Sequence, residues 1–234
     1  MLPTFFRNWK HVFKLDPERS ITDAALEAIC LSGTDAIIVG GSSGVTYENT
    51  VDLLSRIRRY EVPCALELSD VRCGVPGFDG YFIPSVLNTM HTEWMIGHHV
   101  NALQHFAHLL PWESVVGEAY LVLNEESTVA HVSDARANLT IDEAVAYSQV
   151  ADRLWRVPVL YVEYSGKFGS MELVGRIHQG LEQAHLFYGG GIDNASRAQE
   201  AATVSDTIVV GNIIYDNLDA ALATVAAVSL VIKE

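Results

Sequence analysis

Short apolar runs alternate with amphipathic stretches along almost the whole chain. Three of these runs, at 159–166, 185–193 and 207–215, are rich in β-branched and aromatic residues and lead into glycine or a small polar residue. Between them the apolar positions recur at helical spacing, as Leu173 and Ile177 do. Strands that are separated by helices pair in parallel, because a parallel partner needs a long crossover connection. The pattern therefore predicts repeated strand–helix units that build a parallel sheet.

The same alternation extends to the start of the chain and predicts eight strands with helices between them. We expect the strands within 11–15, 35–44, 64–68, 82–88, 118–124, 159–166, 185–193 and 207–215. We expect the longer helices at 22–32, 47–60, 92–110, 140–153 and 217–232. Thr140 and Glu143 form a capping box at the start of one of them. Eight such units are typical of a (β/α)8 barrel, the TIM-barrel fold of the α/β class.

One unit of this predicted barrel is incomplete. Only about a dozen residues separate the third strand from the fourth, whereas a packed helix averages about 11–12 residues by itself. The connection also contains Gly74, Pro76, Gly77 and Gly80, which disfavour a helix. We therefore expect a modified barrel in which a loop replaces helix 3 and one side of the barrel wall is open.

Length and composition fit one domain of this kind. The chain has 234 residues, of which 49% are hydrophobic, and it contains no Pro/Ser-rich or low-complexity stretch. A barrel of this type has roughly 250 residues, so we expect one domain over residues 1–234. No apolar run reaches the roughly 18 residues of a membrane-spanning helix. Charges interrupt the apolar opening segment, so we also expect no signal peptide.

Charge and cysteine content narrow the partners and the compartment. The net charge of −14 disfavours a nucleic acid as partner, because phosphate neutralisation needs a basic surface. An anionic ligand must then be held locally, by backbone amides and a few cations. Cys30, Cys64 and Cys73 lack the spacing of a metal or redox motif, and three cysteines cannot all pair. We therefore expect reduced thiols and a cytoplasmic protein.

Chemistry in such a barrel is expected at the C-terminal ends of the strands. The candidate residues at these positions are Lys14, Asp16, Ser42, Tyr161, Glu163, Ser165, Gly191, Gly211 and Asn212. Gly191 and Gly211 follow strands 7 and 8, where glycine lets backbone N–H groups approach phosphate oxygens. A tight turn is the alternative interpretation for each glycine. Three consecutive glycines, with a further glycine one unit later, favour a phosphate site.

Four polar side chains near this predicted phosphate site have specific interpretations. Lys14 would supply a positive charge to the phosphate, and the alternative is a solvated lysine at the rim. Asp16 and Ser42 offer a carboxylate and a hydroxyl oxygen, which suits Mg²⁺ bound together with substrate phosphates. A turn cap is the alternative for Asp16. Glu163 lies among aromatic residues and suits the role of a base, unless it pairs with Lys14 or Lys167.

Three histidines could be mistaken for a metal cluster. His91, His98 and His105 recur every seven residues and so share a helix face. We favour a solvated or hydrogen-bonded face over a metal site, because the chain has no HExxH motif or comparable close pairing of ligands.

Five stretches of the chain resemble the signatures of one enzyme family. They are WKHVFKLDP (9–17), GTDAIIVGGS (33–42), YVEYSGKFG (161–169), FYGGGI (187–192) and VVGNIIY (209–215). Together, and in this order, they are similar to the geranylgeranylglyceryl phosphate synthase family, in particular to its bacterial PcrB branch, the heptaprenylglyceryl phosphate synthases. The lysine in FKLDP fits the bacterial branch and favours a long prenyl donor, whereas archaeal relatives more often lack it.

The resemblance implies a Mg²⁺-dependent prenyltransferase. Such an enzyme joins a polyprenyl diphosphate, here heptaprenyl diphosphate, to the primary alcohol of sn-glycerol 1-phosphate and releases diphosphate. The glycerol 1-phosphate ligands that the resemblance implies are Lys14, Tyr161, Val162, Glu163, Tyr164, Ser165, Gly166, Gly191, Gly211 and Asn212. Asp16 and Ser42 would bind Mg²⁺, and Glu163 and Tyr161 would be catalytic. The family also suggests a homodimer, and a lipid substrate suggests transient contact with a membrane.

A long prenyl tail needs a dry channel. We expect its lining to include Phe82, Ile83, Val86, Trp94, Met95 and Leu103. Gly97 and Ala102, two small residues on the predicted helix 92–110, would leave the far end of this channel open.

Two other functions remain open from the sequence. An isomerase or aldolase that acts on a small sugar phosphate would share the glycine loops, but it needs neither an apolar channel nor Mg²⁺ at Asp16. The second alternative is a non-catalytic protein that binds a phosphorylated metabolite. The substitution Glu163→Gln would leave such a protein functional, whereas an enzyme would lose turnover and still bind its ligand.

Overall fold

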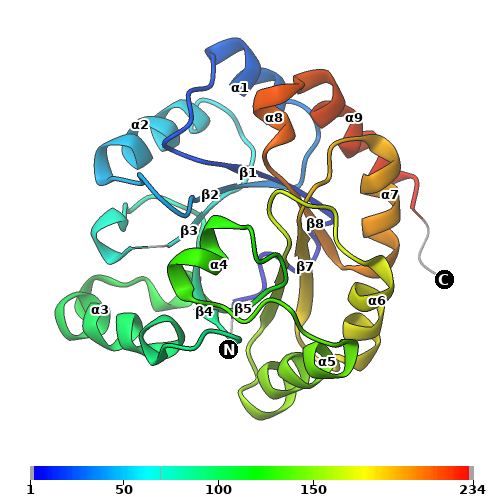
Figure 1. The fold of residues 1–234 in the computed structure, drawn as a ribbon. Coiled ribbons are helices and arrows are strands. Elements are labelled where there is room, and N and C mark those ends of the chain that lie inside the picture. Colours follow the sequence, from blue (N-terminus) through cyan, green and yellow to red (C-terminus); the bar gives the residue numbers. More distant parts are fainter. Residues whose placement is uncertain (1–2, 69, 232–234) are drawn as a thin grey trace.

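Eight parallel strands close into a barrel in the order β1 to β8 (Figure 1). The computed structural model describes residues 3–68 and 70–231. The strands are β1 His11–Leu15, β2 Ala36–Val39, β3 Cys64–Glu67, β4 Gly80–Val86, β5 Val115–Val122, β6 Val159–Glu163, β7 His185–Gly189 and β8 Thr207–Val210. The predicted (β/α)8 fold is therefore confirmed. Two strands start earlier than the sequence predicts, since β4 begins at Gly80 and β5 at Val115.

Helices surround most of the barrel (Figure 1). The α-helices are α1 Asp23–Cys30, α2 Tyr47–Ile57, α3 His98–Phe106, α4 Thr128–Ser133, α5 Ile141–Gln149, α6 Met171–Gly180, α7 Ala195–Val204, α8 Ile213–Asp216 and α9 Leu218–Ser229. The sequence pattern does not predict α4 and α8, because each is too short to show a helical period. Within the described residues, no helix has the length and apolar character needed to cross a membrane.

Two of the predicted helices change their winding along their length. A π-helical turn, Glu93–Gly97, precedes α3, and a 3-10 turn, Ala107–Leu109, follows it. Helix α5 likewise continues as a π-helical turn over Val150–Leu154. π-helical turns are rare in proteins, and those that occur are often found at functional sites. The turn Glu93–Gly97 lies beside the cavity described below.

A loop replaces helix 3, as the spacing predicts. The described part of the connection between β3 and β4 contains a 3-10 turn, Val71–Cys73, and no α-helix. The expectation of an open barrel wall is wrong, because β3 and β4 pair in register from Ala65 and Gly80 to Glu67 and Phe82. The loss of the helix interrupts the outer layer alone, since the strand hydrogen bonds do not depend on what covers them.

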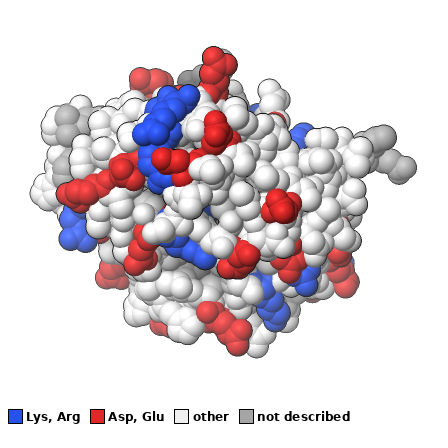
Figure 2. Space-filling model, turned by 90° about the horizontal axis from the view of Figure 1, so that it is seen from above, with Lys and Arg blue, Asp and Glu red and all other residues white. Residues whose placement is uncertain are grey.

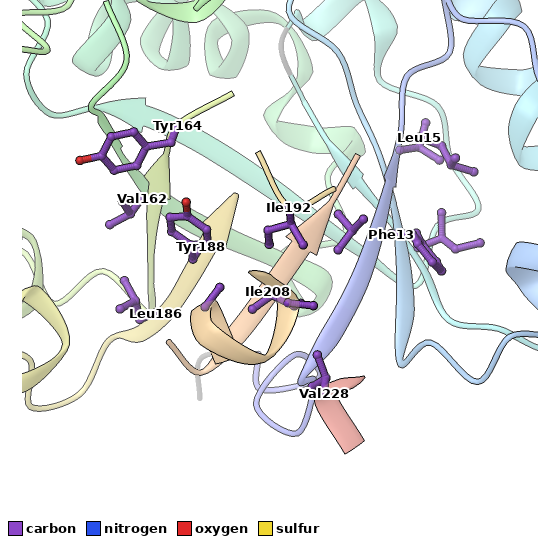
Figure 3. Close-up of a cluster of buried hydrophobic side chains, with 14 of the residues drawn as sticks. Phe13, Leu15, Val162, Tyr164, Leu186, Tyr188, Ile192, Ile208 and Val228 are labelled. Atoms are coloured by element: carbon purple, nitrogen blue, oxygen red, sulfur yellow. The ribbon is translucent and has the colours of Figure 1, made fainter. Parts of the chain in front are cut away.

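Alternate residues of the strands point outward and pack against the helices. Phe13, Val162, Leu186 and Ile208 are fully buried in this layer (Figure 3). Successive side chains of a strand face opposite sides of the sheet. Because both sides are covered here, the strands read as nearly continuous apolar runs.

The inward-facing side chains divide the barrel interior into two parts. Near the N-terminal ends of the strands, Phe6, Trp9, Phe82 and Phe187 fill the interior, and the ring centroids of Phe82 and Phe187 are 5.7 Å apart. The segment before β1 therefore closes this end with aromatic rings. The inward-facing Lys14, Glu67 and Glu163 lie at or next to the C-terminal ends of their strands, where the interior opens to the surface, whereas His185 and Thr207 lie at the N-terminal ends and contact each other.

His11 connects the first strand to the last helix. Its two ring nitrogens lie 2.9 Å from the hydroxyl oxygens of Thr34 and Thr224. Burial lowers the pKa of His11 to about 3, so the ring is neutral at neutral pH. The two ends of the described chain thus meet through a buried, uncharged set of hydrogen bonds.

Candidate active site

A cavity of about 1520 Å³ opens at the C-terminal ends of the strands. The segments that follow β1, β2, β3, β6, β7 and β8 line it, together with residues of β4, β5, α3 and α4. This volume exceeds the roughly 1,000 Å³ at the upper end of common small-molecule pockets. The site therefore has room for a large ligand or for two ligands.

Side chains of both charges line this cavity. Among the described residues, its lysines and arginines are Lys14, Arg19, Arg72 and Arg197, and its carboxylates are Asp16, Glu67, Asp70, Glu163, Asp193 and Asp216. On the face shown in Figure 2, Asp and Glu side chains are scattered, and the Lys and Arg side chains lie among them without forming one continuous patch. The cavity therefore offers positive charge to an anionic ligand at individual side chains, each of which also has a carboxylate partner.

Lys14 lies at the centre of a buried hydrogen-bond network. Its ammonium group donates to Glu67 Oε1 at 2.6 Å and to the Tyr120 hydroxyl at 3.0 Å. The Tyr120 hydroxyl donates to Glu67 Oε2 at 2.8 Å. Burial alone would lower the pKa of Lys14, but the negative charges of Glu67 and Glu163 outweigh it and raise that pKa. Lys14 is therefore a cation with a fixed position at the base of the cavity.

Two stacked tyrosines form the wall beside Lys14. The rings of Tyr120 and Tyr161 have centroids 4.5 Å apart, and Lys14 Nζ lies 5.4 Å from the centre of the Tyr161 ring. Burial, together with the charges of Glu163 and Glu67, raises the pKa of Tyr161 well above its ordinary value. The Tyr161 hydroxyl therefore stays protonated and is available as a hydrogen-bond donor.

Glu163 ends β6 and lines the cavity, although it is only 3% exposed. Its Oε1 atom accepts a hydrogen bond from the backbone N–H of Ser165. Burial raises the pKa of Glu163, and the positive charge of Lys14 opposes this shift. Within the described structure Glu163 forms no ion pair with Lys14 or Lys167, because Lys14 pairs with Glu67 instead. A buried carboxylate of this kind can accept a proton from a bound ligand.

The glycine loop after β7 presents backbone amides to the cavity. Gly190 and Gly191 line it, and within the described residues their N–H groups donate to no protein acceptor. Gly191 has φ +55°, and a methyl group there would lie 2.2 Å from the backbone nitrogen of Phe168, so only glycine fits. Gly211 and Asn212 line the cavity after β8 and lead into α8. A short extra helix at this point is typical of barrel phosphate sites.

Two arginines border these glycine segments. Arg197 donates to the carbonyl oxygen of Gly191 at 3.1 Å. Arg19 donates to Asn212 Oδ1 at 3.2 Å, and its guanidinium lies 3.8 Å from the centre of the Tyr215 ring. The Tyr215 hydroxyl accepts a hydrogen bond from the backbone N–H of Asp16 at 2.9 Å. These contacts hold the loops after β1, β7 and β8 around one mouth.

Asp16 lies against the turn that carries Ser42. A methyl group on Gly41 would lie 2.5 Å from Asp16 Oδ1, so glycine is needed for this close approach. Asp16 Oδ1 also accepts a hydrogen bond from the backbone N–H of Glu18 at 3.0 Å, which is the turn cap that the sequence left as an alternative. Burial raises the pKa of Asp16, and the Glu18 hydrogen bond opposes this. Both Asp16 and Ser42 line the cavity.

This pair fits a Mg²⁺ ion that is shared with a phosphorylated substrate. One carboxylate and one hydroxyl are too few for a site made by the protein alone. In the part of the chain that the structure describes, no group of three His, Cys, Asp or Glu side chains could hold a metal. Mg²⁺ is commonly bound by one or two carboxylates, waters and substrate phosphates, and such a site needs no third protein carboxylate.

The cavity has a second arm beneath α3, which contains most of the apolar lining residues, although His98, His99, Asn101 and His105 of α3 also border the cavity. Ile83, Val115 and Gly117 line it from the outward faces of β4 and β5, and Trp94 and Leu103 line it from the opposite side. The predicted lining residues Val86 and Ala102 also border the cavity. His99 ties α3 to β4, because its Nε2 atom lies 2.9 Å from the carbonyl oxygen of Pro84.

Two residues predicted for this lining do not reach it. Phe82 is fully buried inside the barrel with the aromatic rings of the N-terminal end. Neighbouring residues of a strand point to opposite faces, so Phe82 and Ile83 cannot share one surface. Met95 lies in the π-helical turn and does not border the cavity. Gly97, which is predicted to leave the far end of the channel open, does not border it either.

The structure brings most of the predicted site residues together. Those that line the cavity are Lys14, Asp16, Ser42, Tyr161, Glu163, Ser165, Gly166, Gly191, Gly211 and Asn212. Val162 and Tyr164 do not, because their side chains point outward and are buried against the helices (Figure 3). Glu67, Tyr120, Arg19 and Arg197 also line the cavity and are not among the predicted site residues. Glu67 ends β3, so the search of strand ends that found Glu163 could also have found it.

The predicted histidine face forms individual contacts. His91 Nε2 lies 3.1 Å from Asp134 Oδ2 at the surface. His98, His99 and His105 border the cavity. His91 and His99 thus form hydrogen bonds, to Asp134 and to the carbonyl oxygen of Pro84.

The family of this barrel follows from its similarity to known proteins. A model of the PcrB family matches residues 5–229. The chain belongs to the PcrB family. It is 54% identical over 220 residues to a heptaprenylglyceryl phosphate synthase of Bacillus cereus, and the match covers 94% of this chain and 96% of the relative. A heptaprenylglyceryl phosphate synthase of Bacillus thuringiensis matches with the same identity and coverage.

Solved structures agree with this assignment of the PcrB chain. A (S)-3-O-geranylgeranylglyceryl phosphate synthase from Thermoplasma acidophilum, in complex with sn-glycerol-1-phosphate, superimposes with a TM-score of 0.86 and 25% identity. The match covers 99% of this chain and 100% of that chain. A thiamine phosphate pyrophosphorylase from Pyrococcus furiosus shares the fold, with a TM-score of 0.61 and 15% identity, over 97% of this chain and 98% of that chain.

Proposed function

We propose that this protein is a prenyltransferase that joins heptaprenyl diphosphate to the primary alcohol of sn-glycerol 1-phosphate. The observation that carries the proposal is the form of the cavity. One arm offers free glycine amides, Lys14 and Glu163, and the other arm contains most of the apolar lining residues. An acceptor phosphate fits the first arm and a prenyl chain fits the second. The names of the relatives and the ligand of the Thermoplasma enzyme support the same pair of substrates.

The acceptor is held by its phosphate and presents its alcohol to Glu163. The N–H groups of Gly190 and Gly191 and the segment Gly211–Asn212 bind the phosphate oxygens, and Lys14 adds a positive charge. Tyr161 donates a hydrogen bond from its protonated hydroxyl. Fixing the acceptor in this way lowers the entropic part of the barrier, because the reacting atoms are already aligned.

In the transfer step one bond forms, one bond breaks and one proton moves to the protein. The alcohol oxygen forms a bond to the allylic carbon of the donor, and the bond from that carbon to the diphosphate oxygen breaks. The electron pair leaves with diphosphate, and Glu163 accepts the alcohol proton. The raised pKa of Glu163 makes it a stronger base than an ordinary carboxylate.

We also propose that the reaction needs Mg²⁺, which Asp16 and Ser42 would hold together with the donor diphosphate. When bound there, the ion neutralises the charge that develops on the leaving group. Removal of divalent ions with a chelator should abolish prenyl transfer, and Mg²⁺ should restore it. Full activity in the presence of the chelator would contradict this part of the proposal.

The remaining proposals concern the setting of the reaction. Family membership supports a homodimer, and reduced thiols, since all three cysteines are buried and free, support the cytoplasm. Ile96, Val100 and Trp112 are exposed apolar residues near the apolar arm, which supports transient contact with the membrane that holds a lipid substrate. Sedimentation and binding to phospholipid vesicles test the first and last of these points.

The direct test is incubation with labelled polyprenyl diphosphates of graded length and sn-glycerol 1-phosphate. We expect a labelled prenylglyceryl phosphate, with the highest kcat/KM for the heptaprenyl donor. A sugar-phosphate isomerase or aldolase would give no labelled ether lipid, and a binding protein would retain the acceptor without turnover. Either result would overturn the proposal.

A further inference from the structure

Glu118 lies inside the barrel, in the middle of β5. Its strand neighbours Val116 and Tyr120 belong to the inner core, and its Cα atom pairs with Pro84 and Val159 on the adjoining strands. The residue is only 1% exposed. Within the described residues, its two carboxyl oxygens are the buried side-chain atoms that lack any hydrogen-bond partner. A carboxyl group in this position needs an explanation.

Three charged residues on other strands act electrostatically on Glu118: Lys14 of β1, Glu67 of β3 and Glu163 of β6. Glu67 accepts hydrogen bonds from Lys14 and Tyr120, and Glu163 accepts one from the Ser165 N–H. The single charge of Lys14 thus lies among three carboxyl groups, those of Glu67, Glu118 and Glu163. Of these three glutamates, Glu118 alone accepts no hydrogen bond from the described residues.

We propose that Glu118 is a neutral, proton-bearing acid that keeps the barrel interior from accumulating negative charge and thereby holds Lys14 in place for an anionic substrate. An ionised carboxylate without donors is far more costly to bury than the neutral acid. It would also compete with Glu67 for the ammonium of Lys14 and add a negative charge beneath the phosphate site. Glu118 is thus a positioning residue, and its effect on substrate rests on the proposed function.

The electrostatic surroundings agree with this geometry. Burial and the negative charge of Glu67 raise the pKa of Glu118 well above its ordinary value, and the positive charge of Lys14 opposes the shift. Burial and the same carboxyl charges also raise the pKa of Tyr120 and of Tyr161. Both hydroxyls are therefore neutral and add no positive charge that could stabilise an ionised Glu118.

The protonation state can be tested on the unliganded protein. Glu118→Gln has the shape of the neutral acid and cannot ionise. We expect the infrared spectrum of the wild-type protein at neutral pH to contain the carbonyl band of a protonated carboxylic acid that Glu118→Gln lacks. Glu125→Gln, an exposed control beyond the same strand, should keep the band. If the difference between wild type and Glu118→Gln showed carboxylate bands instead, Glu118 would be ionised and the proposal would be overturned.

The pH dependence of folding gives a second test without substrate. The native state retains the Glu118 proton at a pH at which the unfolded chain loses it. As the pH rises above the ordinary carboxyl range, the unfolding equilibrium constant of the wild type should therefore increase relative to that of Glu118→Gln by up to about tenfold per pH unit. Parallel pH profiles of the two proteins would contradict the assignment.

The effect on Lys14 is tested by binding of sn-glycerol 1-phosphate, measured by calorimetry as a function of pH. We expect the Kd of the wild type to rise as the pH passes the raised pKa of Glu118, and the Kd of Glu118→Gln to rise less. Identical Kd profiles would refute the positioning role. Absence of binding by the wild type at every pH would refute the proposed function instead, and the infrared result would still decide the state of Glu118.

Discussion

The ammonium nitrogen of Lys14 lies 2.6 Å from Glu67 Oε1 and joins β1 to β3 inside the barrel. These strands are not neighbours, because β2 lies between them. The side chains of Lys14 and Glu67 are only 19% and 9% exposed. The pair therefore sets the position of Lys14 at the base of the cavity, and it also connects two separate parts of the barrel wall.

Removal of the Glu67 charge should destabilise the protein. Glu67→Gln leaves Lys14 buried without its counterion, and the loss of one partner of a buried ion pair costs about 3 kcal/mol or more. Urea unfolding should show this decrease in the free energy of unfolding. Glu61→Gln, an exposed control on the preceding loop, should change it by no more than about 0.5 kcal/mol. Equal effects of the two substitutions would mean that the pair is not needed for stability.

The barrel is predictable from the sequence because its strands are apolar on both faces and its helices keep a regular period. The boundaries of β5 are not predictable, since Gly117 and Glu118 interrupt its apolar run. Nor does the pattern show which face of β4 is internal. A shift by one residue exchanges the two faces of a strand, and this is why the sequence pattern misplaces Phe82 but not Ile83.

The candidate site is predictable where chain position alone brings residues together. Strand ends and glycine loops share one mouth in any such barrel, so Asp16, Glu163 and Gly191 can be grouped without a structure. The partner of Lys14 cannot be identified in this way. Glu67 and Glu163 both end a strand with an inward carboxylate, and the choice between them depends on side-chain geometry.

Glu163→Gln should lower kcat by about 10²- to 10⁴-fold, the usual contribution of a general base. The amide keeps the shape of the side chain, so the Kd of sn-glycerol 1-phosphate should change little. Burial raises the pKa of Glu163, and the base acts only when ionised. The wild-type kcat/KM should therefore fall by up to about tenfold per pH unit below that raised pKa.

Steady-state kinetics over a range of pH measure both effects of Glu163→Gln. The acidic limb should be missing from the variant. Glu172→Gln, an exposed substitution in α6, should retain the wild-type profile. A Glu163→Gln enzyme with wild-type kcat would exclude Glu163 as the base.

Gly191→Ala should weaken the acceptor site selectively. The added methyl group would lie 2.2 Å from the Phe168 nitrogen, and the φ of +55° is unfavourable for alanine. We expect the KM for sn-glycerol 1-phosphate to rise about tenfold or more, which corresponds to about 1.4 kcal/mol of lost binding. The KM for the prenyl donor should stay within about twofold of the wild-type value, which is well under 1.4 kcal/mol. Ser196→Ala, exposed in α7, is the control, and an equal rise in both KM values would indicate general distortion instead.

His11 should make the protein less stable in acid. Its pKa is lowered by burial from 6.5 to about 3, so between these pH values the unfolded chain binds a proton that the native state does not. The free energy of unfolding should therefore fall by up to about 1.4 kcal/mol for each pH unit below 6.5. His11→Gln should remove this part of the slope in urea titrations, whereas His108→Gln, exposed at the surface, should not. An unchanged slope in His11→Gln would show that other groups cause the acid sensitivity.

Ala102→Trp should shorten the product. Ala102 borders the cavity at α3, and a large ring there would block the space beyond it, whereas the proposed phosphate and Mg²⁺ ligands lie at the strand ends. With donors of graded length, the ratio of kcat/KM for short over long donors should rise by about tenfold or more, since a clash in a packed site typically costs about 1–3 kcal/mol. Gln104→Trp places the same ring on α3 at an exposed position that does not border the cavity. This control should keep the wild-type preference. If both variants kept that preference, the prenyl chain would have to lie elsewhere than beneath α3.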